Sequence, residues 1–263
     1  MEKVKIFQVD AFTDNLFAGN PAAVCILNDW LPDNLLQKIG AENNLAETAF
    51  IVKREELFEI RWFTPTVEVD LCGHATLASA FVLFDCLNYS KEVIHFSSQK
   101  SGDLFVTKND GDLFLDFPTD SIEPSNNYSG IEGCIGIKPS RVYKGKSDYL
   151  AIVGSEREIR ELQPSITKIN ELDARGLIVT AKGDEADFVS RFFAPQCGID
   201  EDPVTGSAHT SLIPVWSEIL GKKEMKAKQL SKRGGTLICK YNGERCLIGG
   251  SAKLYMTGEI YTE

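Results

Sequence analysis

Short apolar runs that alternate with polar residues recur through the chain and predict a protein built mainly from β-strands. The runs are rich in Val, Ile and Phe and are bounded by Gly, Asn, Asp or Pro, as strands separated by turns are. They are KVKIFQVDAF, AAVCIL, TAFIV, FEIRWF, DLFVTK and DLFLDFP. In TKNDGDL and KYNGERC, an Asp-Gly and an Asn-Gly pair predict two-residue hairpin turns, because such turns require positive φ angles.

Two segments break this strand pattern and predict buried helices. HATLASAFVLFDCL, which begins at His74, is apolar almost all round, and a helix of that kind is buried on every side. SAHTSLIPVWSEIL, which begins at Ser207, has a similar pattern. LPDNLLQKIGAEN, with Pro32 near its first turn, predicts instead an amphipathic helix that covers the outside.

The chain contains an internal repeat. RWFTPTVEVDLCGHATLA resembles RFFAPQCGIDEDPVTGSAHTS, with an offset of 130 residues between their first arginines, at positions 61 and 191. The residues that match at this offset are Arg61, Phe63, Pro65 and Asp70 with Arg191, Phe193, Pro195 and Asp200. A repeat held in register constrains the whole fold, because each copy forms the same structural unit.

The register changes once and then persists. After a three-residue insertion that includes Asp202, the offset becomes 133 and pairs Gly73 with Gly206, and later GDLFV with GTLIC. We therefore predict an α+β fold of two pseudo-symmetric lobes, residues 1–118 and 119–263, with a last strand that can return to the N-terminal lobe. Each lobe is expected to be a mostly antiparallel, barrel-like sheet around a central helix.

Composition narrows the class of protein. The 263 residues are 43% hydrophobic, which is ample for a core, and the formal net charge of −10 argues against nucleic acid or an anionic membrane as the main partner. Seven cysteines without a CxxC pair favour a reducing compartment over a disulfide framework. No signal-type block begins the chain, and no apolar run reaches the roughly 18–20 residues of a membrane span. We expect a cytoplasmic protein.

The two glycine-centred turns, LCGHAT and VTGSAHT, are candidates for binding an anion. Gly73 and Gly206 stand where the two buried helices begin, and the first backbone N–H groups of a helix lack partners within it. Two such helix starts related by pseudo-symmetry predict a clamp for a carboxylate. The alternative is that the glycines only allow close packing, with His74 and Ser207 as ordinary caps.

Two acids stand out. Glu47 lies in NNLAETAFIV among apolar neighbours, and we expect desolvation to raise its pKa toward neutrality, which suits a group that takes and gives a proton. Its equivalent in the second lobe is approximately Arg175, and an ordinary structural glutamate is the alternative. Asp202 precedes Pro203 in DEDPVTGS, which is consistent with a rigid turn aimed at a cleft, or with a cap on a helix beginning near Thr205.

Cys72 and His74 admit three further interpretations, none of which we favour. A Cys-x-His triplet has no fixed tendency to hydrogen-bond, which argues against a nucleophile and its base. A zinc site from Cys72, His74 and His209 would need these residues to converge, so we expect no metal. A racemase with one thiol per lobe lacks its second thiol, because the residue aligned with Cys72 is Thr205.

Four motifs, in order, resemble a known family. They are VDAFTDNLFAGNPAAV, the AET around Glu47, DLCGHATLA and GIDEDPVTGSAHT, and they are similar to those of the PhzF-like (phenazine-biosynthesis) isomerases, whose fold resembles diaminopimelate epimerase. The resemblance implies an active site in the cleft between two lobes. It also implies that a glutamate, here Glu47, moves a proton between carbons of a carboxylate substrate as general acid/base, without a cofactor.

The same resemblance implies roles for other residues. His74 and Asp202 would act with Glu47 in catalysis, and the substrate, a small amino-acid-like carboxylate, would be bound by Cys72, Gly73, Gly206 and Ser207. Members of the family commonly form homodimers, so a homodimer is implied. The alternatives are a binding or regulatory protein that keeps the cleft without chemistry, and, more remotely, a hydrolase that uses Cys72.

Overall fold

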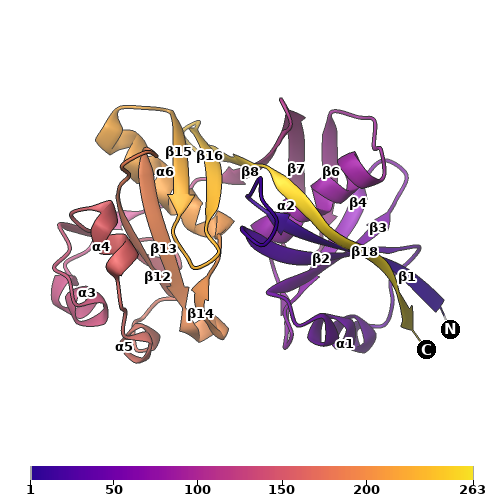
Figure 1. Ribbon diagram of the computed structural model, residues 1–263, viewed down its shortest axis with the longest axis horizontal. Helices are drawn as coiled ribbons and strands as arrows, with labels where there is room; N and C mark the ends of the chain where they lie inside the picture. The colour runs from indigo at the N-terminus through magenta and orange to yellow at the C-terminus, as the bar shows by residue number, and fades with distance from the viewer. Residues whose placement is uncertain (1, 263) are drawn as a thin grey trace. The chain divides into compact units, whose positions relative to one another are not determined.

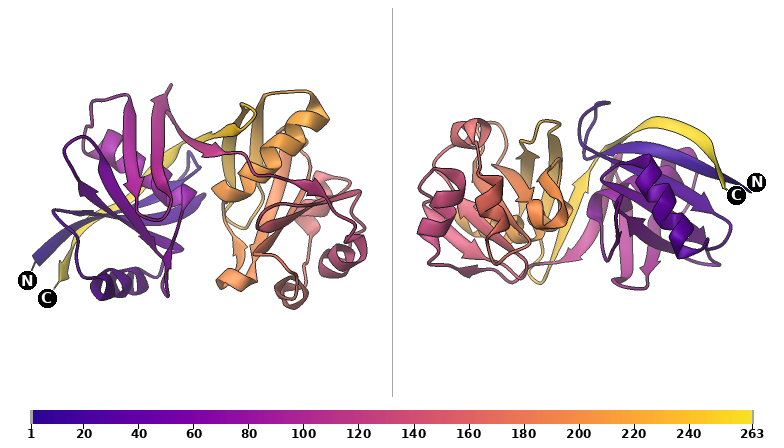
Figure 2. Two further views of the ribbon diagram at one scale, coloured as in Figure 1. Left: turned by 180° about the vertical axis from the view of Figure 1, so that it is seen from behind. Right: turned by 90° about the horizontal axis from the view of Figure 1, so that it is seen from below.

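The computed structural model describes residues 2–262 and divides into two compact units. The first unit consists of the chain up to Asp116 and from Gly249 onward, and the second is Phe117–Ile248. The last strand, β18 (Ala252–Thr262), belongs to the first unit, where it pairs antiparallel with β1 (Glu2–Ala11). The two strands run side by side in Figures 1 and 2.

The first unit contains a mixed sheet. Successive pairings join β18, β1, β2, β3, β4, β6, β7 and β8, and β5 adds to β4; β2–β3 and β4–β6 are parallel and the other pairs are antiparallel. The strands are β2 (Asn20–Leu27), β3 (Glu47–Lys53), β4 (Phe58–Phe63), β5 (Glu68–Val69), β6 (Val93–Ser98), β7 (Gly102–Asn109) and β8 (Asp112–Pro118).

Two helices cover opposite faces of this sheet. Phe50 and Val52 of β3 pack against Leu36 and Ile39 of α1 (Asp33–Asn43), the predicted outer helix. The intervening side chains of β3 point to the other face, because side chains alternate along a strand. There α2 (Gly73–Phe81) packs against β1, β2 and β3 and continues into a π-helical turn, Val82–Cys86. The α2 side chains from His74 to Ala80 are buried, which confirms the central helix.

The second unit repeats the same order of pairings. Its sheet joins β9, β10, β11, β12, β13, β15 and β16, with β11–β12 and β13–β15 parallel and the others antiparallel. The strands are β9 (Glu123–Pro124), β10 (Arg141–Lys144), β11 (Asp148–Ile152), β12 (Gly176–Lys182), β13 (Phe188–Ala194), β14 (Ile199–Asp202), β15 (Glu224–Gln229), β16 (Gly235–Tyr241) and β17 (Arg245–Gly250). The α+β, pseudo-symmetric fold is thus confirmed.

Helices again lie on both faces of the sheet. Leu177 and Val179 of β12 face a cluster formed with α3 (Tyr128–Ile135), α4 (Glu156–Glu161) and α5 (Ile166–Asn170). Thr180, one position along, accepts a hydrogen bond of 3.0 Å from the indole of Trp216 on α6 (Gly206–Leu220). Alternation along β12 therefore separates the outer helices from the buried one. No helix in residues 2–262 is long and apolar enough to cross a membrane.

Strand register corrects the predicted position of the insertion. Trp62 and Phe192 match each other at the offset of 130. Val69 of β5 pairs with Trp62, and Asp202 of β14 pairs with Phe192. Asp202 therefore corresponds to Val69, and the offset at this point is already 133. The predicted match of Asp70 with Asp200 is therefore wrong, as is the placement of Asp202 in the insertion. The extra residues precede β14, where Pro195–Cys197 form a 3₁₀ turn.

Register also identifies the counterpart of Glu47. Thr48 pairs with Phe63, and Leu177 pairs with Phe193, so the residue before Leu177, Gly176, corresponds to Glu47. The expected counterpart, Arg175, is one position away. A Cβ at Gly176 would lie 2.6 Å from the Phe193 carbonyl oxygen and 2.7 Å from the Phe192 ring. The second unit therefore has no room for a side chain at the position that holds the acid in the first.

We expect Gly176→Ala to destabilise the protein by about 1–3 kcal/mol, because the added methyl group meets backbone and a packed ring. Gly133→Ala is the matched control: Gly133 lies in α3, and nothing lies within 4 Å of the Cβ it would gain. That change should be neutral or stabilising by up to about 1 kcal/mol, since alanine favours helix. Urea unfolding compares the two, and equal midpoints would contradict the argument.

The two predicted hairpin turns differ. Asp110 and Gly111 join β7 to β8 with φ angles of 51° and 91°, which confirms the two-residue turn. Between β16 and β17 the loop has three residues rather than two, and only Gly243 has a positive φ, of 80°. There the Asn242 N–H donates to the Arg245 carbonyl at 2.9 Å. The prediction of a two-residue Asn-Gly turn is therefore wrong.

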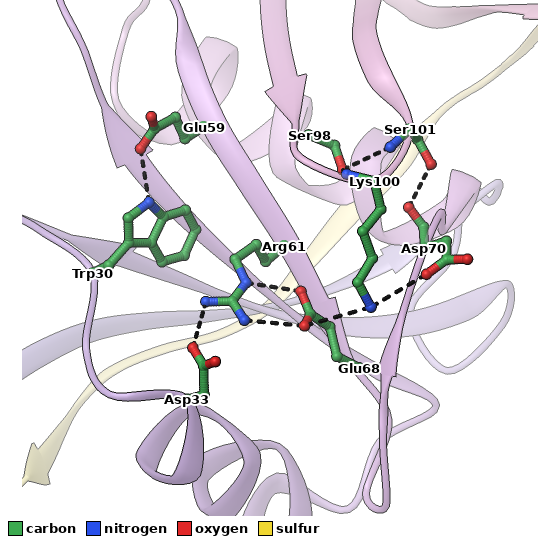
Figure 3. A network of polar contacts seen from close by, with 9 residues as sticks. All are labelled: Trp30, Asp33, Glu59, Arg61, Glu68, Asp70, Ser98, Lys100 and Ser101. Atoms are coloured by element: carbon green, nitrogen blue, oxygen red, sulfur yellow. Dashed lines mark hydrogen bonds and ion pairs between the residues drawn. The ribbon is translucent and has the colours of Figure 1, made fainter.

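A repeated Arg–Glu pair holds the segment that leads into each buried helix. Arg61 of β4 donates two hydrogen bonds, of 2.8 and 3.0 Å, to Glu68 of β5, and Figure 3 shows the network around it. In the second unit Arg191 of β13 donates to Glu201 of β14 at 2.6 and 2.9 Å. Bidentate pairs of this kind fix orientation as well as distance. The repeated arginine therefore positions the chain just before α2 and α6.

Candidate active site

The start of α2 brings three reactive side chains together. Glu47 is the first residue of β3, Cys72 precedes α2, and His74 is the second residue of that helix. The Nε2 atom of His74 lies 3.1 Å from Oε2 of Glu47, and its Nδ1 atom lies 3.5 Å from the Cys72 sulfur. A Cys-x-His triplet has no fixed tendency to make this contact, but here the extended conformation of Cys72 before the helix places its sulfur beside the ring.

Asn20 is a neighbour of this cluster that sequence reasoning did not single out. It begins β2, two residues before Ala22, which pairs with Glu47. Its side-chain amide nitrogen lies 3.1 Å from Nδ1 of His74. A half-turn of the amide would present its oxygen instead, so Asn20 can serve His74 as donor or acceptor. The available signal was a polar residue at the start of the apolar run NPAAV, and the structure shows that this residue is fully buried.

The cluster is shielded from water without being sealed. The side chain of Glu47 keeps 12% of its surface exposed and that of His74 keeps 6%. Oε2 of Glu47 contacts His74 as an ion pair but has no aligned hydrogen-bond partner. One oxygen of a nearly buried carboxylate thus retains the capacity to accept a proton or bind a cation.

The pKa of Glu47 differs from the expectation. Burial acts to raise this pKa, but the charge of His74 and the polar contacts of His74 and Cys72 with the carboxylate outweigh burial and lower the pKa below its ordinary value of 4.5. The prediction of a raised pKa is therefore wrong. The apolar residues that flank Glu47 in sequence matter less than a histidine from another element, and only the fold brings that histidine close.

The protonation of the other two groups follows. Burial would lower the pKa of His74, but the negative charge that Cys72 and Glu47 can carry raises this pKa well above 6.5. Burial and the charge of Glu47 raise the pKa of Cys72 to about 11, so the thiol is neutral near pH 7. The charge that faces His74 is then that of Glu47. The cluster is a carboxylate–imidazolium pair beside a neutral thiol.

The start of α6 is built differently. Thr205 occupies the position before the helix that Cys72 occupies in the first unit, and its hydroxyl donates to Asp202 at 2.5 Å. Its backbone N–H donates to the side-chain oxygen of Gln229 at 2.9 Å. Asp202 therefore contacts the start of the helix through the Thr205 hydroxyl.

Ser207, the second residue of α6, lies beside a cation. The Nη2 atom of Arg175 donates to the Ser207 hydroxyl at 3.0 Å, while Arg175 also forms a two-point ion pair with the buried Asp148. Sequence reasoning had identified Arg175 only as an approximate counterpart of Glu47. Nothing in the sequence near Arg175 indicated this contact, because 32 residues separate it from Ser207.

The structure thus places the predicted site residues in two groups. The group in the first unit comprises Glu47, Cys72, Gly73 and His74, and the group in the second comprises Asp202, Gly206 and Ser207. The predicted site in a cleft between the lobes stays a prediction. The zinc set considered from sequence is revised, since the third ligand-type group near Cys72 and His74 is Glu47, whereas His209 belongs to the second unit.

Comparisons with known proteins agree with this architecture. Residues 9–258 match the family described as phenazine biosynthesis-like protein. An uncharacterized isomerase of Pseudomonas aeruginosa is 49% identical over 259 residues, which cover 98% of this chain and 99% of that protein. A PhzF-family phenazine biosynthesis protein of Enterococcus faecalis has a TM-score of 0.96 and 45% identity, and the match covers 99% of this chain and 100% of that one.

A more distant structure shares the fold alone. It is a hydroxyproline epimerase of Agrobacterium vitis with bound trans-4-hydroxy-L-proline, with a TM-score of 0.62 and 10% identity over 98% of this chain and 92% of that one. The family match and the names of near full-length relatives support an isomerase-like function. The sequence motifs, the fold and the near full-length matches lead to one conclusion: the chain belongs to the phenazine biosynthesis-like, or PhzF, family.

Proposed function

We propose that the protein is a cofactor-independent isomerase or epimerase that moves a proton between carbons of a small, amino-acid-like carboxylate. Glu47 is the general acid/base. The observation that carries this proposal is the nearly buried Glu47–His74 ion pair, in which Oε2 of Glu47 has no aligned hydrogen-bond partner. The isomerase names of the relatives support the class of reaction.

In this proposal Glu47 works as a base and then as an acid. Its carboxylate takes a proton from a substrate carbon, and the electron pair of the broken C–H bond delocalises into the adjoining carbonyl or double bond. The carboxylic acid so formed returns the proton to a different carbon, or to the other face of the same one. His74, as imidazolium, stabilises the negative charge that develops. Substrate and product are isomers, so no oxidant or reductant is required.

The remaining predicted residues hold the substrate in this proposal. The backbone N–H groups at Gly73 and His74 begin α2, where the helix dipole favours a carboxylate. Gly206 and Ser207 would do the same at α6, and Asp202 would orient the substrate. Cys72 stays protonated at neutral pH because its pKa is about 11, and Thr205 stands in its place before α6. These facts favour a single carboxylate base over a pair of thiols.

A screen in heavy water tests the proposal. The protein is incubated with a panel of amino-acid-like carboxylates, and each compound is recovered and examined by mass spectrometry and NMR for deuterium on carbon. We expect at least one compound to gain deuterium or to rearrange. A compound that binds but gains no deuterium at any carbon would favour the alternative, a binding or regulatory protein on the same scaffold.

We expect the exchange rate to form a plateau in pH that extends below 4.5 and above 6.5. The pKa of Glu47 is lowered, so the active carboxylate is lost only below 4.5; the pKa of His74 is raised, so the imidazolium is lost only above 6.5. In His74→Gln the fall of the exchange rate at high pH should disappear. The fall at low pH should begin at a higher pH, because burial then raises the pKa of Glu47 without the opposing effect of His74. An unchanged profile in His74→Gln would contradict this assignment.

Two further expectations stay predictions. The family resemblance implies a homodimer, which analytical ultracentrifugation of the full chain measures directly. The cysteine usage predicts a reducing, cytoplasmic environment, which fractionation of the producing cells tests, and the family resemblance implies a role in biosynthesis.

A further inference from the structure

We propose that Glu47, Cys72 and His74 form a binding site for Zn²⁺ or a similar thiophilic divalent cation, and that the bound ion inhibits proton transfer. The site itself rests on the geometry of the three side chains. Its inhibitory effect rests in addition on the function proposed above, since the ion would occupy the oxygen that has to accept the proton.

The set of donor atoms favours zinc over the common hard cations. A carboxylate oxygen, a cysteine sulfur and an imidazole nitrogen are all ligands that zinc accepts, and three protein ligands leave one tetrahedral position open. Magnesium and calcium prefer oxygen ligands throughout, so a sulfur and a nitrogen out of three count against them. In residues 2–262 this is the group of three His, Cys, Asp or Glu side chains that converges closely enough to hold an ion.

The distances suit such an ion with small adjustments. The three ligand atoms all lie within 4.8 Å of one another, with 3.1 Å from Oε2 of Glu47 to Nε2 of His74 and 4.0 Å from that nitrogen to the Cys72 sulfur. Zinc bonds of about 2.0–2.3 Å in tetrahedral geometry separate ligand atoms by roughly 3.3–3.8 Å. The observed separations, from 3.1 Å to at most 4.8 Å, lie on either side of that range, so side-chain shifts of up to about 1 Å are sufficient.

The surroundings of His74 resemble the outer support of a metal site. Metal-bound histidines use one ring nitrogen for the ion and bond a protein group through the other, which fixes the ring. Here Nε2 faces Glu47 while Nδ1 lies 3.1 Å from the Asn20 amide, which can turn to accept a proton from Nδ1. Asn20 is fully buried at the start of β2, so this support is rigid.

Metal coordination releases protons from the ligands but changes no oxidation state. Bonds form from the ion to the oxygen of Glu47, the sulfur of Cys72 and Nε2 of His74; the thiol proton and the Nε2 proton are released to solvent. The lone pair of Glu47 is then engaged by the ion and cannot accept a proton from a substrate carbon. In Cys72→Ser the thiolate ligand is lost, so the affinity for zinc falls while Glu47 remains in place.

Binding is tested on the full chain after treatment with a chelator. Calorimetry with Zn²⁺ is expected to give one equivalent per chain, and Cd²⁺ is expected to produce the ultraviolet absorption of a cadmium–thiolate bond. Cys72→Ser should lose this absorption and bind Zn²⁺ at least about tenfold more weakly. Cys197→Ser, at an exposed thiol, is the matched control and should behave as wild type. Circular dichroism and thermal unfolding confirm that each variant is folded.

The outcomes separate this inference from the proposed function. No zinc binding by the wild type, or equally tight binding by folded Cys72→Ser, overturns the metal site even if deuterium exchange is found. One equivalent of zinc with a cadmium–thiolate band, lost in Cys72→Ser, supports the site even if no carboxylate exchanges. Where exchange is found, added Zn²⁺ should suppress it in the wild type, and a chelator should restore it; exchange that persists in the zinc-loaded protein overturns the inhibitory effect.

Discussion

Glu47→Gln is expected to lower the rate of substrate proton exchange by about 10²- to 10⁴-fold, the range in which general acid/base groups contribute. Glutamine keeps nearly the same shape but can neither take nor return a proton. Because the side chain of Glu47 touches His74 and keeps only 12% exposure, a neutral replacement also leaves His74 without its ion-pair partner. The rate is measured as deuterium uptake at saturating substrate, together with the dissociation constant of the substrate.

The matched control for this variant is Glu55→Gln. Glu55 is an exposed glutamate between β3 and β4 of the same unit, and its change removes the same charge from the surface. We expect its exchange rate to equal that of the wild type. If Glu47→Gln exchanges its substrate as fast as Glu55→Gln does, Glu47 is not the proton carrier.

Acidification from pH 6.5 to pH 4 is expected to cost about 3 kcal/mol of folding free energy through one residue, His209. This side chain is fully buried, and burial lowers its pKa to about 4. The unfolded chain binds a proton near pH 6.5 and the folded chain does not, so the stabilisation is complete above 6.5 and is lost as the pH falls toward 4. Urea unfolding at several pH values within this window measures the slope.

Replacement of His209 isolates its share of the slope. His209→Gln removes the titrating group and should flatten the loss of stability over this window, even if the variant is less stable at pH 7. Leu212→Ala, a fully buried change on the same helix without a titrating group, is the matched control and should lower the stability at every pH while keeping the wild-type slope. His74 titrates with the opposite sign: its raised pKa gives stability that is complete below 6.5 and lost at higher pH. An identical slope in His209→Gln would contradict the assignment.

The architecture could be predicted from sequence because its signals are local and repeated. Apolar residues between turn-forming residues indicate strands such as β3 and β8. Apolar residues on all sides indicate the buried helices α2 and α6. The repeat then required the two units to be alike, and their strand pairings follow the same order. Each of these signals depends on neighbours within one element, or on a fixed register between copies.

The chemistry of the site could be predicted only in part, because it depends on contacts between elements. The sequence around Glu47 is apolar, which predicts a raised pKa for its carboxyl group. In the structure, however, His74 of α2 lies beside Glu47 and lowers the pKa of that group. Asn20 joins the cluster from β2 by strand pairing alone. Likewise, residue identity aligned Asp70 with Asp200, whereas strand register makes Val69 the counterpart of Asp202.

The deuterium content of a recovered carboxylate, after incubation in heavy water with metal-free protein, shows whether Glu47 carries a proton to and from carbon. We expect the wild type and Glu55→Gln to place deuterium on a substrate carbon without any added cofactor, and Glu47→Gln to do so at least about 10²-fold more slowly. Equal deuterium uptake by Glu47→Gln and the wild type would contradict this role of Glu47.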